Sequence, residues 1–264
     1  MDMQGVGVVT EVEDWWATAV SRIEPGIIEL RGIPIQELIG KAGLVDIIWL
    51  MLRGTPPEPR QATLLEAALV AAVDHGPHAP SIAAARMAAT CGVGLNSAVA
   101  TGVNMLGDAH GGAGQQCVQL LTEICDHLHD SGSDLESATR EVLAKWRSQS
   151  PYIPGFGHRF HAVDPRTAPL LSLVDDAARD GVVAGHHLAA ARAIQAVLAP
   201  VPINIDGTTA VIYAELGFPA PLARGLFVLS RSVGILAHAW EETQQGRRIK
   251  GPIPPSIRPT YLGA

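Results

Sequence analysis

The sequence is poor in aromatic residues and in charge. Of its 264 residues, 5% are aromatic and 17% are charged, while 47% are hydrophobic. The core must therefore be built mainly from Ala, Leu, Val and Ile, a composition that favours closely packed helices over sheets. The length allows one large domain, or one domain that carries a smaller lobe.

Basic clusters, a leader and long apolar runs are also missing. The net charge of −7 and the pI near 5.8 argue against a nucleic-acid-binding surface. The first sixteen residues are acidic and lack the charged-then-apolar pattern of a signal peptide. Apolar runs such as Ala67–Val73 are too short to span a bilayer. We therefore expect a cytoplasmic protein that binds neither nucleic acid nor membrane.

Cysteine is scarce. Cys91, Cys117 and Cys125 form no Cys-x-x-Cys pair and fall in apolar helical surroundings. This pattern predicts reduced core residues and no disulfide framework. Cys117 is a poor candidate for a nucleophile because it falls inside a predicted helix with no evident base beside it.

Apolar periodicity predicts a mainly α-helical chain with one short hairpin near the N-terminus. The hairpin is expected around Glu24-Pro25-Gly26. A capping box, Ser133-x-x-Glu136, is expected to open one helix. Helices are predicted at about 36–53, 64–73, 82–89, 96–106, 115–128, 133–147, 167–180, 186–198, 207–216 and 222–240. Proline-bounded ends also predict a smaller lobe over 115–203, with 1–114 and 204–264 forming the larger domain.

The last predicted helix has two regular patterns. Arg224, Arg231 and His238 recur every seven residues on one side. Another side is expected to be buried, because large apolar residues follow a 4-3-4-3-4 spacing at Leu222, Leu226, Leu229, Val233, Leu236 and Trp240. The tail 251–264 is rich in proline and is expected to be extended, with Arg258 within it.

Four loops each present one polar group suited to chemistry. Proline fixes φ and glycine admits positive φ, so Pro154, Gly155 and Gly157 shape the loop before His158. The other three groups are His75, His110 and Asp206, also beside glycines or prolines. Arginines that could bind carboxylates bidentately are Arg31, Arg166, Arg231 and Arg258.

Three other interpretations of these loops have less support. A metal site could use His75-x-x-His78 or His158-x-x-His161, but no cysteine and no helical His-x-x-x-His pair accompanies them. Gly112-Ala-Gly114 follows no strand, and a cysteine stands where a dinucleotide loop has its third glycine. The segment 152–166 could also be a solvated connector. We expect no metal and no cofactor.

In order along the chain, the loops carry a set of specific motifs. They are Arg31-Gly, Asp74-His75-Gly, His110-Gly-Gly-Ala, Pro-Gly-Phe-Gly-His158-Arg with Asp-Pro-Arg166, Asn-Ile-Asp206, Ser-Arg231, Ala-His238 and Ile-Arg258-Pro. From about residue 18 to 263 the chain resembles the citrate synthase superfamily. The resemblance implies an all-α fold of large and small helical domains with a cleft between them. It also implies a homodimer, or a higher oligomer of dimers.

The resemblance further implies carbon–carbon bond chemistry on a coenzyme A thioester, with coenzyme A as part of the substrate. His110 would hydrogen-bond the thioester oxygen as it becomes an enolate, and Asp206 would exchange the methyl proton. His158 would bond the oxygen that is a ketone in oxaloacetate and a hydroxyl in the citryl group. These roles suit the physics, since a fixed donor at a developing enolate stabilises it strongly in a dry site.

The dicarboxylate part of such a substrate needs several fixed cations. By the same resemblance, His75, Arg166 and Arg231 would hold its carboxylates. Arg258 would reach across from the partner subunit.

Some features depart from typical citrate synthases. The chain is much shorter between Arg53 and His75, and the spacer from His158 to Arg166 lacks one residue. Gly207 follows Asp206 where the synthases have an aromatic residue. Asp74-His75-Gly-Pro and Asn-Ile-Asp206-Gly are more similar to the stand-alone citryl-CoA lyases and to the lyase module of ATP-citrate lyase.

The leading hypothesis is therefore a lyase that cleaves citryl-CoA, or a close analogue, to acetyl-CoA and oxaloacetate. The alternative is a citrate or 2-methylcitrate synthase. A third possibility is a silent paralogue that binds an acyl-CoA or a partner protein, but His110, His158 and Asp206 are all present.

Overall fold

The computed structural model describes residues 15–158 and 162–263. These residues are mostly helical, and the one sheet among them has three short strands, which confirms the all-α prediction. The chain forms two compact units, one ending at Thr63 and one beginning at Leu64. The predicted division into 115–203 and the remainder is a different one and stays a prediction.

The first unit contains the predicted hairpin. Strand β1 (Ser21–Glu24) pairs antiparallel with β2 (Ile27–Leu30), and Gly26 adopts φ 78° in the turn between them. A short strand β3 (Ile33–Pro34), which the sequence did not predict, adds to the other edge of β2.

The helix predicted over 36–53 is broken in two. Helix α2 (Ile35–Leu38) ends before Gly40, which adopts φ 76°, and α3 (Leu44–Arg53) begins after Gly43. The backbone N–H of Gly43 donates to the Asp46 carboxylate at 2.8 Å, which fixes the new helix start. At the other end of α3, the Arg31 guanidinium donates to the Met51 carbonyl oxygen at 2.6 and 3.0 Å. Arg31 is thus a cap of α3 in this unit.

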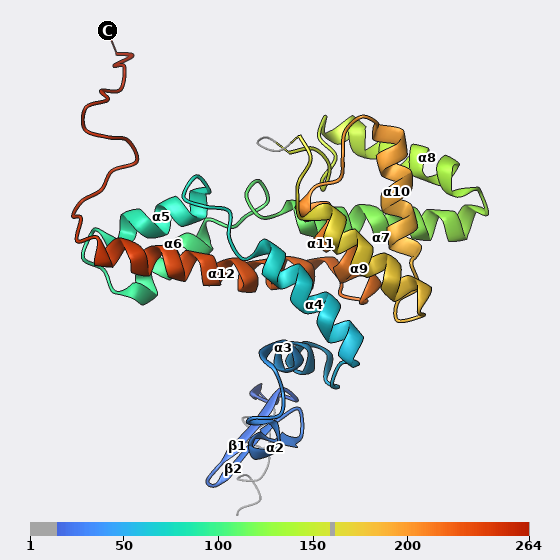
Figure 1. Cartoon of the computed structure of the whole chain (residues 1–264), viewed down its shortest axis with the longest axis horizontal. Helices are drawn as coiled ribbons and strands as arrows, with labels where there is room; N and C mark the ends of the chain where they lie inside the picture. The colour runs from blue at the N-terminus through green and yellow to red at the C-terminus, as the bar shows by residue number, and fades with distance from the viewer. Residues whose placement is uncertain (1–14, 159–161, 264) are drawn as a thin grey trace, which may run out of the picture. The chain divides into compact units, whose positions relative to one another are not determined.

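In the second unit, the described residues form helices and no strand, apart from one isolated bridge (Figure 1). Its helix α4 begins in the first unit. The bounds are α4 Pro59–Ala72, α5 Pro80–Ala89, α6 Leu95–Asn104, α7 Ala113–Ser131, α8 Leu135–Gln149, α9 Thr167–Arg179, α10 His186–Leu198, α11 Ile205–Glu215 and α12 Ala220–Gln244. The longest, α12, contacts α5, α6, α7 and α11.

Two helix starts differ from the sequence prediction. The side chain that caps α8 is Asp134, which accepts from the Ser137 N–H at 3.0 Å, so the capping box at Ser133 is wrong. Helix α11 begins at Ile205 because Asn204 accepts from the Gly207 N–H at 3.1 Å. Asp206 therefore lies in the first turn of a helix and not in a loop.

The core has two centres. In one, α5, α6 and α12 approach closely through small side chains around Ile82 and Ile235, both fully buried. Gly102 of α6 permits this, since a Cβ there would lie 2.7 Å from Cγ2 of Ile235. In the other, α7, α10 and α11 bury large aliphatic side chains: Leu120, Leu121, Ile124, Ile194 and Ile212.

The buried side of α12 is not the predicted one. Leu226 is buried, but Leu229, Val233, Leu236 and Trp240 are 44–57% exposed. Small or polar residues face the core instead, including Ala223, Ser230, Arg231, Gly234 and Ala239. The spacing identified a regular apolar face correctly, but close packing selected the face with the smallest side chains.

By length and composition, α12 is also apolar enough to cross a membrane. Core helices pass the same test, and α12 packs against α5, α6 and α7 while burying Arg231 and Glu242.

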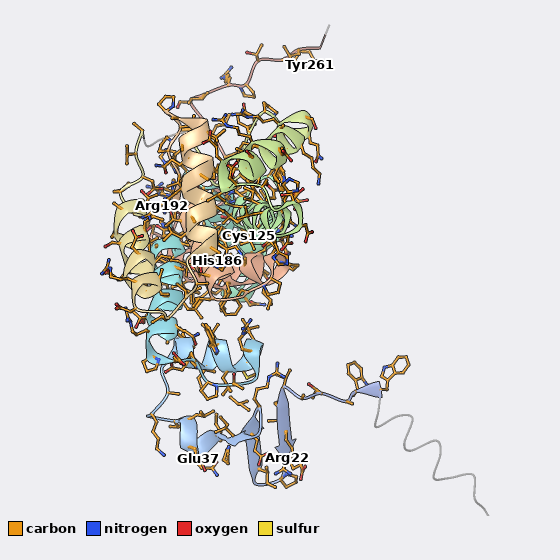
Figure 2. The ribbon with its side chains drawn as sticks, turned by 90° about the vertical axis from the view of Figure 1, so that its right-hand side faces the viewer. Arg22, Glu37, Cys125, His186, Arg192 and Tyr261 are labelled. Atoms are coloured by element: carbon orange, nitrogen blue, oxygen red, sulfur yellow. The ribbon has the colours of Figure 1, made fainter. Side chains whose placement is uncertain are left out.

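The three cysteines lie in different surroundings, and all are free. Cys117 is buried on α7, and Cys125 is partly buried near His186 of α10 (Figure 2). Cys91 is exposed, so its prediction as a core residue is wrong: it follows the end of α5, beside a turn at Gly92. After Gly251 the described residues form neither helix nor strand and are exposed, as at Tyr261 (Figure 2).

Ile235 offers a direct test of the helix packing. Replacing it with Ala should reduce the free energy of unfolding by about 3 kcal/mol, because the cavity would lie between α5, α6 and α12. Val70 on α4 is 65% exposed, so Val70→Ala should change it by less than about 0.5 kcal/mol. Urea denaturation measures both, and equal losses would contradict this packing.

Candidate active site

A cavity of about 370 Å³ in the second unit collects most of the residues that the sequence singled out. His75, His110, His158, Asp206 and Arg231 all line it. They come from the segments after α4, before α7 and before α9, and from the helices α11 and α12. Five polar groups from five separate segments thus converge on one space.

The His158 loop and the helix of Asp206 meet through two glycines. Gly155 adopts φ 84°, and a Cβ there would lie 2.7 Å from Cα of Gly207. A Cβ on Gly207 would in turn collide with the carbonyl oxygen of Gly155. Asn204 completes the junction: its N–H donates to Gly155 O at 2.9 Å and its side-chain amide donates to Gly157 O at 2.5 Å. Gly207 is therefore required for the packing of α11 against the His158 loop, whatever it contributes to the reaction.

Asp206 lies at the floor of the cavity in the first turn of α11. Burial raises its pKa, against the attraction of Arg231 and Arg166. The carboxyl group therefore holds a proton at a higher pH than an ordinary Asp does. A carboxyl group with a raised pKa, directed into a cavity, is suited to exchange a proton with a ligand.

His110 is held by the start of α5. The backbone N–H of Ser81 donates to Nε2 of His110 at 3.2 Å, and the Ser81 hydroxyl lies 2.9 Å from the same nitrogen. A backbone N–H can only donate, so Nε2 accepts and the ring proton lies on Nδ1. His110 is thereby fixed as a neutral ring whose donor is Nδ1–H.

The rings of His75 and His158 lie close to each other in the lining of the cavity. Their ring centroids are 5.5 Å apart, with an angle of 33° between the ring planes. Both rings are partly exposed, and both line the cavity that Asp206 borders. Two imidazoles at this spacing can bind two neighbouring oxygen atoms of one ligand.

Arg231 is the buried cation of the site. It is 6% exposed, its Nε donates to the Ala72 carbonyl oxygen at 3.0 Å, and its guanidinium lies over the Phe227 ring at 5.0 Å. Burial lowers its pKa, against the attraction of Asp206 and Asp74. The guanidinium is thus oriented by the end of α4 and by an aromatic ring.

Arg166 is engaged in a local ion pair. Its Nε and one terminal nitrogen donate to the two oxygens of Asp164 at 2.9 and 2.7 Å, and its other terminal nitrogen donates to Ala71 O at 3.2 Å. It is not among the described residues that line the cavity. Its predicted role in binding a carboxylate stays a prediction.

Arg258 lies in the exposed segment after Gly251 and does not line the cavity in the single chain. The prediction that it completes the site of a partner subunit is not tested by one chain.

Sequence reasoning missed three residues that shape the site. Ser81 fixes the ring of His110, Asn204 joins the His158 loop to the start of α11, and Phe227 lies under Arg231. Asn204 could have been found, because an Asn two residues before Asp206 is a typical helix cap. Ser81 and Phe227 carry no local pattern, since each acts on a residue far away in the chain.

The alternative chemistries have little support in the described part of the chain. No group of three or more His, Cys, Asp or Glu side chains there is placed to hold a metal ion. The second residue of the His158-x-x-His161 spacing lies outside the described residues. Burial raises the pKa of the Cys117 thiol, which opposes the thiolate that a nucleophile needs.

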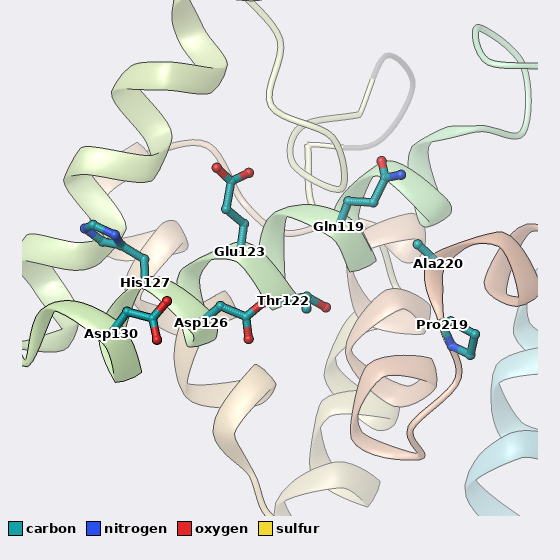
Figure 3. Close-up of a pocket in the computed structure, with 8 residues that line it drawn as sticks. All are labelled: Gln119, Thr122, Glu123, Asp126, His127, Asp130, Pro219 and Ala220. Carbon is teal, nitrogen blue, oxygen red and sulfur yellow. The ribbon is translucent and has the colours of Figure 1, made fainter.

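A second cavity, of about 520 Å³, lies along α7 and the start of α12 (Figure 3). Its lining contains three carboxylates, Glu123, Asp126 and Asp130, and one histidine, His127, which pairs with Glu141. Glu123 is paired with Lys145, and the remaining carboxylates Asp126 and Asp130 disfavour an anionic ligand there. The cavity around His110 and Asp206 is therefore the candidate active site.

Comparison with known proteins identifies the family to which this chain belongs. The family described as "Citrate synthase, C-terminal domain" matches residues 51–260, so the chain belongs to the citrate synthase family. Citrate synthase of Acidithiobacillus ferridurans is 28% identical over 213 residues, which cover 76% of this chain and 52% of that protein. The chain thus spans about half the length of the curated citrate synthases it matches.

Two solved structures of lyases share the fold. The citryl-CoA lyase of Hydrogenobacter thermophilus has a TM-score of 0.82 and 30% identity, covering 94% of this chain and 95% of that one. The ATP citrate lyase of Methanothrix soehngenii, solved with citrate and coenzyme A, has a TM-score of 0.75 and 18% identity. That match covers 100% of this chain and 45% of the lyase, and it shows the fold alone.

The Asp164–Arg166 pair predicts a pH dependence of stability. Burial of Asp164 would raise its pKa, but Arg166 outweighs this and lowers it from 3.8 to about 2. A depressed carboxyl pKa stabilises the fold above pH 4, and this stabilisation is lost as the pH falls from about 4 to about 2. Asp164→Asn should therefore be destabilised by on the order of 2 kcal/mol at pH 6, with the difference from wild type shrinking below pH 4.

Asp175→Asn is the control, since Asp175 and Arg192 form an exposed pair and its loss should cost less than about 1 kcal/mol. Urea denaturation at several pH values measures both variants. A difference between wild type and Asp164→Asn that stays constant down to pH 2 would contradict this account of the ion pair.

Proposed function

We propose that this protein is a citryl-CoA lyase, which cleaves citryl-CoA or a close analogue to acetyl-CoA and oxaloacetate. The observation that carries the proposal is the convergence of His110, His158 and Asp206 on one cavity. The correspondence in length with the citryl-CoA lyase of Hydrogenobacter thermophilus, which the chain matches over 95% of that protein, supports it.

The cleavage begins at the tertiary hydroxyl of the citryl group. His158 accepts the hydroxyl proton, the carbon–carbon bond breaks, and its electron pair moves into the thioester portion as an enolate. The hydroxyl oxygen becomes the ketone of oxaloacetate. His75, beside His158, and Arg231 bind the carboxylates of that half, in line with the 5.5 Å between the two rings.

His110 stabilises the enolate. It donates Nδ1–H to the thioester oxygen. The hydrogen bond from the Ser81 N–H to Nε2 supports this role, because it leaves the ring proton on Nδ1. A fixed donor of this kind contributes about 3 kcal/mol of transition-state stabilisation. Asp206 then delivers its proton to the methylene carbon and leaves acetyl-CoA. The raised pKa of Asp206 supports this step, because the cleavage direction needs the protonated acid.

The second candidate is a citrate synthase, which the names of the curated relatives favour. A synthase forms the same bond in reverse and must then hydrolyse the thioester of citryl-CoA. The two functions differ in whether water attacks that thioester.

Product analysis separates the two functions. With citryl-CoA, a lyase releases acetyl-CoA and oxaloacetate in equal amounts. With acetyl-CoA and oxaloacetate, it does not release free coenzyme A over many turnovers. Steady multiple-turnover formation of citrate and free coenzyme A would make the protein a synthase.

Replacing the proposed catalytic groups should remove turnover and leave the fold intact. We expect His110→Ala and Asp206→Asn to lower kcat by ~10²–10³, since each loses a group that acts on the reacting atoms. The melting temperature should stay near that of wild type, because both side chains face the cavity. Activity within a few-fold of wild type in either variant would refute the assignment.

We also propose that the protein works as a homodimer. The motivation is the exposed apolar face of α12, formed by Leu229, Val233, Leu236 and Trp240, because such a face on a soluble chain usually marks an interface. A partner subunit is also the source that the proposal requires for Arg258. Both the apolar face of α12 and Arg258 lie outside the cavity of the single chain.

Val233→Asp should convert the dimer to a monomer in analytical ultracentrifugation and reduce activity with it. Val70→Asp, on an exposed position of α4, is the matched control and should stay dimeric. A wild-type protein that sediments as a monomer at micromolar concentration would contradict the proposal.

A further inference from the structure

Three polar residues of α12 contact three different segments of the active site. Arg224, Arg231 and His238 are spaced seven residues apart, so they lie on one side of the helix, each about two turns, or ~10 Å, from the next. Arg231 contacts the end of α4 and lines the cavity itself. Arg224 and His238 do not line it, although each contacts a loop that does.

Arg224 holds the loop of His110. Its terminal nitrogen forms an ion pair with the Asp108 carboxylate, in which the Arg224 side chain is 26% exposed and the Asp108 side chain 83%. Within that loop, the Gly107 N–H donates to the His110 carbonyl oxygen at 2.9 Å. Gly112 packs against Asp108, because a Cβ on Gly112 would lie 2.5 Å from the Asp108 carbonyl oxygen. Asp108 and His110 therefore belong to one compact loop, to which Arg224 is joined through the Asp108 carboxylate.

His238 holds the loop of His75. Its Nε2 lies 3.3 Å from the Asp74 carboxylate, which also accepts from the Gly76 N–H at 3.1 Å. Asp74 and Gly76 are the two neighbours of His75 in the chain. Gly234, one turn before His238, lets this loop lie on the helix, because a Cβ there would collide with the Val73 carbonyl oxygen.

The ring of His238 has a defined orientation and tautomer. The Arg86 guanidinium lies 3.3 Å from its Nδ1. A guanidinium can only donate, so Nδ1 accepts and the proton lies on Nε2, directed at Asp74. Arg86 is itself held at 2.6 Å by Glu242, whose side chain is fully buried and also pairs with Lys250 at 2.8 Å.

We propose that Arg224 and His238 are positioning residues, which hold the His110 and His75 loops at a fixed separation along α12. This proposal rests on the proposed function for its kinetic consequences but not for its structural ones. The two residues act on different steps. Arg224 positions the donor to the enolate, and His238 positions a group that binds the dicarboxylate half.

The kinetic effects should therefore separate. Arg224→Met should lower kcat for citryl-CoA cleavage by about tenfold or more, with KM changed little, because small displacements of a catalytic group cost up to ~10² in rate. His238→Leu should instead raise KM by about tenfold, with kcat within a few-fold of wild type.

Conservative variants test the contacts themselves. Arg224→Lys keeps the charge opposite Asp108, and His238→Gln keeps one donor and one acceptor, so both should recover most of the loss. If Arg224 acts through Asp108, Arg224→Met combined with Asp108→Asn should be no worse than Arg224→Met alone. The matched controls are Arg192→Met and His127→Ala, which break the pairs Arg192–Asp175 and His127–Glu141 and should leave kcat and KM unchanged.

Hydrogen–deuterium exchange provides a readout that needs no activity. Arg224→Met should increase exchange in residues 107–112 and not in 73–78, and His238→Leu should do the reverse. If wild type does not turn over citryl-CoA, the proposed function fails while these exchange patterns still decide the positioning proposal. Unchanged exchange in both loops, or equal effects of both variants on kcat and KM, would overturn it.

Discussion

The close approach of two backbones at Gly155 and Gly207 is the contact on which the rest of the site depends. It leaves no room for a side chain at either position, and it places the loop of His158 directly against the first turn of α11. Asn204 fixes that junction by capping α11 and bonding to the loop with the same side chain. As a result, a histidine and a carboxyl group from distant parts of the sequence face one cavity.

The other half of the site is organised by α12. This helix reaches the core between α5 and α6 through small residues, and it contacts the His75 and His110 loops through polar ones. The cavity thus has one wall set by contacts between glycines and one set by ion pairs along a helix. Such rigidity suits a reaction in which separate groups must act on adjacent atoms of one substrate.

Much of this arrangement could be predicted from the sequence. The hairpin, most helices and the cavity-lining group of His75, His110, His158, Asp206 and Arg231 follow from local patterns and specific motifs. Three features could not be predicted in this way: the break at Gly40, the exposed face of α12 and the exposure of Cys91. Each of these depends on long-range packing or on which of two glycines ends a helix, and spacing alone does not contain that information. The pairing of Arg166 with Asp164 was missed for a related reason. A sequence motif identifies an arginine, but it does not show which carboxylate the guanidinium group binds.

The central claim is that the cavity breaks a carbon–carbon bond and returns a proton to the resulting enolate. The most direct measurement is cleavage of citryl-CoA in deuterium oxide, with mass spectrometry of the products. The proposed delivery of a solvent-exchangeable proton by Asp206 predicts that the acetyl-CoA formed carries deuterium in its methyl group, alongside an equal amount of oxaloacetate. Release of citrate and free coenzyme A, or acetyl-CoA without deuterium, would contradict the claim.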